Sequence, residues 1–142
     1  MMDDQEDCFH LGIKALIRNN EGKILLLERD HPLANKYWDI PGGRLLRKES
    51  IMDTLKREVE EETGLKIIQK VHPFEMFLTD IRIPTSQSNV GLIFSIFLCE
   101  IAFSFDPRLS AEHVGFEWCF PRLAAQKLTQ FPADFRNKLE NL

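Results

Sequence analysis

The sequence predicts an α+β fold in which a central mixed β-sheet lies between helices, an α/β/α sandwich. Strand patterns come before, between and after the helical patterns, so one sheet and its helices must share a core. The length of 142 residues suits one domain, and 44% hydrophobic with 28% charged residues is typical of globular proteins. We expect a single domain at residues 9–142, after a disordered acidic tail at residues 1–8.

The first part of the domain predicts a β-hairpin followed by a loop. Apolar runs at residues 9–17 and 23–29 predict strands joined by an Asn-Asn-Glu-Gly turn. Residues 30–37 combine His-Pro with small and polar side chains, which predicts a loop. A short extended piece at residues 38–40 then runs into Pro-Gly-Gly, a sequence that breaks regular structure.

Residues 50–63 give the clearest helix of the chain. Ser50 can cap its N-terminus, and Asp53 stands three positions later, as in a capping box. Gly64 is placed where a C-terminal cap belongs. An apolar stripe predicts the face that packs on the sheet, and it consists of Ile51, Leu55 and Val59.

The remaining segments alternate between strand and helix patterns. We expect strands at residues 65–71, 75–83, 90–103 and 113–120, a hairpin loop at 84–89, and helices at 123–126 and 132–142. Pro132 suits a helix start because its fixed backbone angle is compatible with a helix and its missing N–H would have no helical partner there.

Charge and cysteine content narrow the partners and the compartment. The formal net charge is −4 without a stripe of Lys or Arg, which argues against stable nucleic-acid binding and against an anionic membrane surface. The N-terminus lacks the features of a signal peptide, and the most apolar run, residues 90–99, is too short for a bilayer. Cys8, Cys99 and Cys119 form no CxxC pair and no disulfide framework. We expect a cytoplasmic protein whose cysteines serve packing.

The end of the predicted helix is unusually acidic. Glu58, Glu61 and Glu62 share one helix face, whereas Glu60 points away. Two carboxylates about 4 Å apart repel by about 4 kcal/mol at an effective dielectric of about 20, and the helix dipole disfavours acids at this end. The single Arg57 cannot neutralise three acids, so the cluster indicates a divalent cation, Mg²⁺ or Mn²⁺ for all-oxygen ligands. The helix alone leaves a solvated charged face open as the alternative.

The residues around this helix fill every defined position of the pattern G-x5-E-x7-R-E-U-x-E-E-x-G-U, where U is a bulky apolar residue. A chance match is on the order of 10⁻⁸ per starting position at ordinary residue frequencies. The segment therefore resembles the Nudix box, and the Trp-x-x-Pro-Gly-Gly and Glu-x-Trp segments are similar to this family as well. The matching residues are Gly43, Glu49, Arg57, Glu58, Val59, Glu61, Glu62, Gly64 and Leu65.

The resemblance implies the Nudix α/β/α sandwich and roles for particular residues. Arg57 is expected to orient a glutamate, and Gly43 to offer its backbone to metal or phosphate. Apart from the resemblance, Arg29 at the end of the second strand and Arg44 in a basic loop are candidates to contact substrate phosphates, and a solvated surface position is the alternative for each. The metal ligands implied are Glu58, Glu61, Glu62, Glu49, Gly43 and Glu112, and the catalytic residues are drawn from Glu58, Glu61, Glu112 and Arg57.

The resemblance also implies an activity and its rivals. A short MutT-like member would be a Mg²⁺- or Mn²⁺-dependent pyrophosphohydrolase of a (d)NTP or a small nucleoside diphosphate linked to another group, releasing a nucleoside monophosphate, as a monomer or homodimer. Diadenosine polyphosphates and capped RNA stay open as substrates. The alternatives are an inactive nucleotide sensor, which the complete set of box glutamates disfavours, and an isoprenoid diphosphate isomerase, which would need further Cys and His ligands.

Two further sequence features bear on the substrate. Many family members carry Glu at the position of Leu46 and Gly at that of Lys48, so the basic loop departs from the usual pattern. For each candidate for recognising a base, core packing is the favoured interpretation; the candidates are Tyr37, Trp38, Phe74, Phe77, Asn89 and Phe116.

Overall fold

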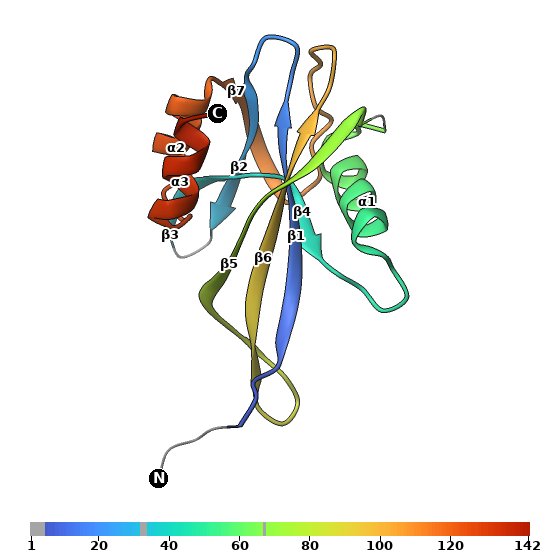
Figure 1. Cartoon of the computed structure of the whole chain (residues 1–142), viewed down its shortest axis with the longest axis vertical. Helices are drawn as coiled ribbons and strands as arrows, with labels where there is room; N and C mark the ends of the chain where they lie inside the picture. The colour runs from blue at the N-terminus through green and yellow to red at the C-terminus, as the bar shows by residue number, and fades with distance from the viewer. Residues whose placement is uncertain (1–4, 32–33, 67) are drawn as a thin grey trace.

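A mixed β-sheet forms the centre of the molecule (Figure 1). The computed structural model describes residues 5–31, 34–66 and 68–142, and within these the sheet has seven strands. Its main order is β3 (Ala34–Asp39), β2 (Ile24–His31), β1 (Phe9–Arg18), β6 (Asn89–Glu100) and β5 (Lys70–Pro84). In addition, β4 (Gly42–Arg44) pairs with β1, and β7 (His113–Cys119) pairs with β2. The β1–β6 pair is parallel and the other pairs are antiparallel.

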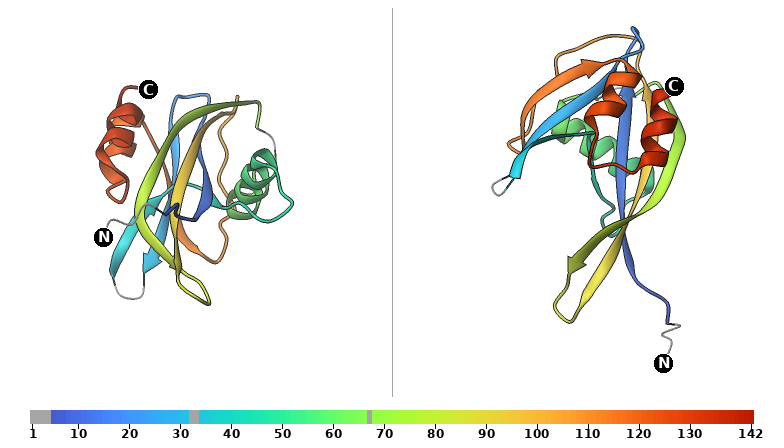
Figure 2. Two further views of the ribbon diagram at one scale, coloured as in Figure 1. Left: turned by 60° about the horizontal axis from the view of Figure 1, so that its bottom comes forward. Right: turned by 90° about the vertical axis from the view of Figure 1, so that its left-hand side faces the viewer.

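Helices cover both faces of this sheet (Figure 2). α1 (Ile51–Thr63) lies on one face, and α2 (Pro121–Lys127) and α3 (Ala133–Glu140) lie on the other. Successive side chains of a strand point to opposite faces, so Leu16 joins the core under α2 and α3 while Ile17 joins the core under α1. The predicted α/β/α sandwich with a mixed sheet is confirmed.

The helix that carries the acidic cluster begins and ends as its sequence predicts. The Ser50 hydroxyl accepts a hydrogen bond from the Asp53 N–H, and the Asp53 carboxylate accepts one from the Ser50 N–H. Gly64 ends the helix with φ of 80°, a left-handed conformation that glycine adopts without strain. These caps fix where the glutamates stand relative to the sheet.

Several predicted boundaries are wrong, and tertiary pairing is the common reason. The loop expected at residues 30–37 is largely strand, because β3 pairs with β2 and so satisfies its backbone groups; Pro32 and Leu33 lie outside the described residues. The Pro-Gly-Gly segment does not simply break regular structure, because its two glycines begin β4, which pairs with β1.

The strands after α1 also differ from the predicted ones. The strand expected at 65–71 is absent among its described residues before Lys70, and Ile67 lies outside them. Instead β5 is one 15-residue strand that continues through Pro73 by a register shift against β6. β6 ends at Glu100 rather than at residue 103. The pairing with β6, which is distant in sequence, decides the length of β5.

The acidic tail expected at residues 1–8 is described only from Gln5 onward. Within the described part, Asp7 forms an exposed ion pair with Arg82, at 2.7 Å between Oδ2 and Nη1. The carbonyl of Cys8 accepts a hydrogen bond from the Gly91 N–H. These contacts lead the chain into β1.

Candidate active site

Two glutamates of α1 reach the Gly-Gly segment at the edge of the sheet. Glu62 is buried, with 5% of its surface exposed, and its Oε1 accepts a hydrogen bond of 2.8 Å from the Gly42 N–H. Glu58 lies against Gly43 so closely that a Cβ at this position would come within 2.2 Å of Glu58 Oε1. Only glycine at position 43 lets the β4 backbone and the Glu58 carboxylate approach in this way.

Arg57 ties the surrounding acids together. Its Nε donates to Glu49 Oε2 at 2.6 Å, and its Nη1 donates to Glu58 Oε1 at 2.7 Å and to Glu61 Oε2 at 3.3 Å. The hydrogen bond from Arg57 lowers the pKa of Glu49 to about 2. Glu49 also accepts from the Thr54 hydroxyl at 3.0 Å, so it braces the start of α1 against Arg57. Arg57 therefore holds Glu58 in place by a charge-assisted bond.

Burial disfavours the ionised form of the two inner carboxylates, Glu58 and Glu62. Desolvation raises the pKa of Glu62 to about 7, although the Gly42 N–H and Lys14 act in the opposite direction. Desolvation also raises the pKa of Glu58, against the effect of Arg57. The charge of Glu58 also raises the pKa of Glu62, and those of Glu61 and Glu112 raise the pKa of Glu58, as expected for clustered acids.

The donor chemistry of this cluster fits a hard divalent cation. The candidate ligands are carboxylate oxygens beside an exposed backbone turn, which Mg²⁺ and Mn²⁺ prefer. Among the described residues, no group of three or more His, Cys, Asp or Glu side chains stands in positions that could hold a metal ion. Mg²⁺ commonly binds through one or two carboxylates and keeps its other positions for water and substrate phosphate, so Glu58 and Glu62 suffice as a partial shell.

Glu112, in the loop before β7, forms an ion pair with Arg29. Arg29 Nη2 donates to Glu112 Oε2 at 2.9 Å, and Arg29 Nη1 lies 3.6 Å from Asp39 Oδ2. The Glu112 side chain is 65% exposed and so remains free to turn. His113, the next residue, is buried, and its Nε2 lies 3.7 Å from Glu62 Oε2. The loop before β7 thus reaches the same centre as α1.

A cavity of about 620 Å³ opens beside Arg29, on the sheet face that α2 and α3 cover. Its wall includes a buried ion pair, in which Lys14 Nζ donates to Asp39 Oδ1 at 3.0 Å. Aromatic and polar side chains complete the wall, among them Tyr37, Phe77, Phe94, Phe131, Asn35 and Gln130. Both Lys14 and Arg29 act electrostatically on Glu62, so the cavity and the acidic cluster lie close together.

The structure brings together most of the residues predicted from sequence, but not all. Gly43, Glu49, Arg57, Glu58, Glu61 and Glu62 form one cluster, and Arg29 connects Glu112 to the cavity. Arg44 is exposed on β4, and its Nη1 lies 3.0 Å from His10 Nδ1 rather than on the cavity wall. Arg44 therefore gains no support here as a phosphate contact.

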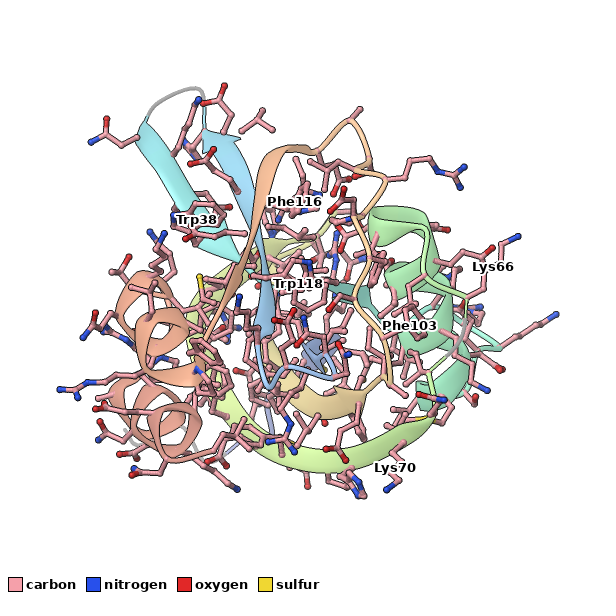
Figure 3. The ribbon with its side chains drawn as sticks, turned by 90° about the horizontal axis from the view of Figure 1, so that it is seen from above. Trp38, Lys66, Lys70, Phe103, Phe116 and Trp118 are labelled. Carbon is pink, nitrogen blue, oxygen red and sulfur yellow. The ribbon has the colours of Figure 1, made fainter. Side chains whose placement is uncertain are left out.

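The candidates for base recognition divide in the same way. Tyr37 and Phe77 line the cavity. Trp38, on β3, packs against the core beneath α2 with the Lys127 ammonium 4.8 Å from its ring centre, whereas Phe116 lies on β7 (Figure 3). Asn89 accepts a hydrogen bond from Arg82 in the hairpin.

Sequence reasoning missed the Lys14–Asp39 pair, Phe94 and Phe131. One signal was present, since Lys14 is the single charged residue inside the apolar run of β1. A lysine there must either break the pattern or meet a partner, and the partner comes from β3, which local pattern did not predict.

Comparisons with known proteins agree with this geometry. The family model described as NUDIX domain matches residues 9–139. The nucleoside triphosphatase NudI of Escherichia fergusonii is 32% identical over 114 residues, which are 75% of this chain and 79% of that protein. The crystal structure of a MutT protein from Methanosarcina mazei Go1 is 27% identical, with a TM-score of 0.66 over 97% of this chain and 95% of that one.

A third similarity concerns the fold alone. The binary complex of a Caenorhabditis elegans Ap4A hydrolase has a TM-score of 0.70 at 19% identity and covers 92% of each chain. Separately, across residues 5–31, 34–66 and 68–142 no helix has the length and apolar character needed to cross a bilayer.

Proposed function

Because this chain belongs to the Nudix family and is a pyrophosphohydrolase acting on acid anhydrides, we propose that it requires Mg²⁺ or Mn²⁺ and acts on a (d)NTP or a small nucleoside diphosphate linked to another group. The product is a nucleoside monophosphate. The observation that carries the proposal is the contact of two partly buried carboxylates, Glu58 and Glu62, with the Gly42–Gly43 backbone. This arrangement suits a cation that bridges an acidic protein and a polyphosphate.

Each residue of the cluster has a task in this proposal. Glu58 and Glu62 would hold the ion, which neutralises phosphate charge and makes phosphorus more electrophilic. Arg57 fixes Glu58, and the Gly42 N–H fixes Glu62, so both oxygen ligands are oriented before substrate arrives. Glu49 positions Arg57 and is a supporting residue or an accessory ligand.

A glutamate must also take a proton from the attacking water. Glu61 and Glu112 have side chains that are 57% and 65% exposed, so either can turn toward a bound substrate, and Glu58 is the third candidate. Loss of a general base typically lowers the rate by about 10²–10⁴-fold. Arg29, which contacts Glu112 and lines the cavity, would meet a substrate phosphate.

The cavity supports a nucleotide as the substrate. Its volume of about 620 Å³ lies inside the usual range of about 300–1,000 Å³ for small-molecule sites. Aromatic walls with a few polar groups suit a nucleoside. The phosphates would then lie at the acidic cluster, where the proposed cation would bridge them to the carboxylates. The three free thiols support a cytoplasmic location, and we propose a monomer or homodimer.

The test compares wild type with Glu62→Gln and with Glu60→Gln as the matched control. Glu60 lies on the same helix, 52% exposed, and its contact is an ion pair with Lys66 at 3.9 Å. Each protein is incubated with Mg²⁺, Mn²⁺ or EDTA and with NTPs, dNTPs, NDP-sugars, ADP-ribose and dinucleoside polyphosphates, and products are separated by chromatography.

We expect a nucleoside monophosphate product only with metal, a loss of about 100-fold or more in Glu62→Gln, and wild-type rates in Glu60→Gln. If a folded protein binds nucleotides but turns over none of them with either metal, the inactive sensor becomes the better proposal.

A further inference from the structure

The buried imidazole of His113 faces a proposed metal ligand, although it takes no part in the reaction steps proposed above. Its side chain is 1% exposed, and its Nε2 lies 3.7 Å from Glu62 Oε2. The other oxygen of this carboxylate, Oε1, accepts a hydrogen bond of 2.8 Å from the Gly42 N–H. The two oxygens of Glu62 therefore face two different strands, β4 through Gly42 and β7 through His113.

An irregularity in strand pairing determines where His113 points. Glu28 of β2 pairs with Gly115, and the next residue, Arg29, pairs with His113, so Val114 is an extra residue in β7. Side chains alternate between the two faces of a regular strand, which would put His113 on the same face as Gly115. The bulge brings it to the other face instead, where it is buried, while Val114 is 49% exposed. Bulges commonly redirect a side chain in this way beside an active site.

Hydrogen bonds in the loop before β7 favour one tautomer of this ring. Ser110 Oγ lies 3.3 Å from His113 Nδ1 and accepts from the Glu112 N–H at 3.4 Å. Because accepting that bond does not use the hydroxyl hydrogen, Ser110 is free to donate it to Nδ1. The neutral imidazole then carries its proton on Nε2, the nitrogen that faces Glu62. The ring thus presents a hydrogen-bond donor to the carboxylate.

We propose that His113 is a positioning residue that orients Glu62 for metal binding through its Nε2–H, an inference that rests on the metal-dependent hydrolysis proposed above. Nε2 and Oε2 stand slightly beyond hydrogen-bond distance, so a small rotation of the Glu62 carboxylate brings them into a bond. The other inner carboxylate, Glu58, already has such a partner in Arg57. Partners of this kind hold a metal ligand in its orientation, and losing one typically costs about 10–100-fold in metal affinity or activity.

The two ring nitrogens allow the orienting role to be separated from a purely structural one. The side-chain N–H of Asn lies close to the position of the ring Nδ1, whereas that of the longer Gln reaches the position of Nε2. His113→Asn therefore keeps the contact with Ser110 and loses the donor toward Glu62, and His113→Gln keeps that donor. His113→Leu removes both contacts. His72→Leu is the matched control, because His72 stands on β5 with its side chain 56% exposed.

The full chain is titrated with Mn²⁺ without nucleotide, and the free ion is followed by electron paramagnetic resonance; urea denaturation and nucleotide turnover are measured on the same samples. We expect His113→Asn and His113→Leu to bind Mn²⁺ about 10–100-fold more weakly than wild type, and His113→Gln and His72→Leu to stay within about threefold. If His113→Leu does not fold, the comparison of Asn with Gln decides. Wild-type affinity in His113→Asn, an equal loss in His113→Gln, or no Mn²⁺ binding by wild type overturns the inference.

The two proposals fail in different ways. Mn²⁺ binding that depends on position 113 in this manner, without hydrolysis of any nucleotide, refutes the proposed function and leaves the positioning role of His113 standing. Metal-dependent hydrolysis together with wild-type Mn²⁺ affinity in His113→Asn supports the proposed function and refutes the positioning role.

Discussion

The acidic cluster on α1 and the Lys14–Asp39 pair are two polar centres of the described chain, and they differ in charge. In the cluster one guanidinium, Arg57, contacts the three carboxylates of Glu49, Glu58 and Glu61, so the centre stays anionic. On the cavity wall the carboxylate of Asp39 meets two cations, Lys14 at 3.0 Å and Arg29 at 3.6 Å. The cluster therefore attracts a cation, whereas the second centre carries no excess of negative charge.

The two centres also differ in how far apart in the sequence their residues lie. The cluster belongs to α1 and the loop before it, and its charged residues, from Glu49 to Glu62, lie within about four helix turns of one another in sequence. The pair joins β1 to β3 in the wall of the cavity on the α2 and α3 side. Local sequence therefore specifies the first centre, and strand pairing creates the second.

The largest effect on stability should come from breaking the Lys14–Asp39 ion pair. Lys14→Met leaves Asp39 buried without its lysine and should lower the free energy of unfolding by about 3–5 kcal/mol. Lys14→Met/Asp39→Leu removes both charges and should stay within about 1 kcal/mol of wild type. Urea denaturation of both variants measures this, and equal losses in the two would show that the pair itself stabilises the fold.

A change at the acidic cluster should lower the rate of turnover. In Gly43→Ala the new Cβ would lie 2.2 Å from Glu58 Oε1, so the carboxylate or β4 must move. A displacement of about 1 Å can cost about 100-fold in rate, and we expect a loss of this size in kcat/KM. Gly115→Ala is the control, because its Cβ would meet the end of the Glu28 side chain at 3.2 Å. Similar losses in both variants would contradict a special role for position 43.

The third prediction concerns the pH dependence of stability in the metal-free protein. The hydrogen bond from Arg57 lowers the pKa of Glu49 from its ordinary 4.5 to about 2. A lowered pKa in the folded state means that the stabilising contribution is present above pH 4.5 and is lost as the pH falls through about 2. The difference in unfolding free energy between wild type and Glu49→Gln should therefore shrink over this interval. In an Arg57→Gln background the trend should vanish, and its persistence there would assign it to another group.

The smallest effect is expected in the loop that leads to the cluster. Lys48 has φ of 69°, a left-handed conformation that costs a side chain about 1–2 kcal/mol, part of which the greater entropy of unfolded glycine offsets. Lys48→Gly should raise the free energy of unfolding by about 0.5–1 kcal/mol. Arg47→Gly, at a position without positive φ, should lower it. A destabilised Lys48→Gly would mean that the lysine side chain makes a contribution larger than the strain.

The contrast between the centres explains what could be predicted from sequence. Ser50, Asp53 and Gly64 specify the ends of α1 through bonds within a few residues, so this helix and the grouping of its acids are predictable. The strand β3 lacks a clear apolar alternation and exists because β2 supplies its hydrogen bonds. Because the pairing of β3 with β2 was not predicted, no sequence pattern placed Asp39 beside Lys14. The strand predicted at residues 65–71 was wrong for the complementary reason: the apolar pattern is strand-like, but the register with β6 begins only at Lys70.

The parallel pairing of β1 with β6 has a consequence for the order of folding. Phe9 pairs with Gly91 and Arg18 with Glu100, so the first strand to leave the ribosome must wait for about 80 further residues before its partner exists. Until then the sheet partners of β1 among the described residues are β2 and β4. Closure of the sheet centre is therefore a late event of synthesis, and nascent chains that end before β6 should remain open to proteolysis and to chaperones.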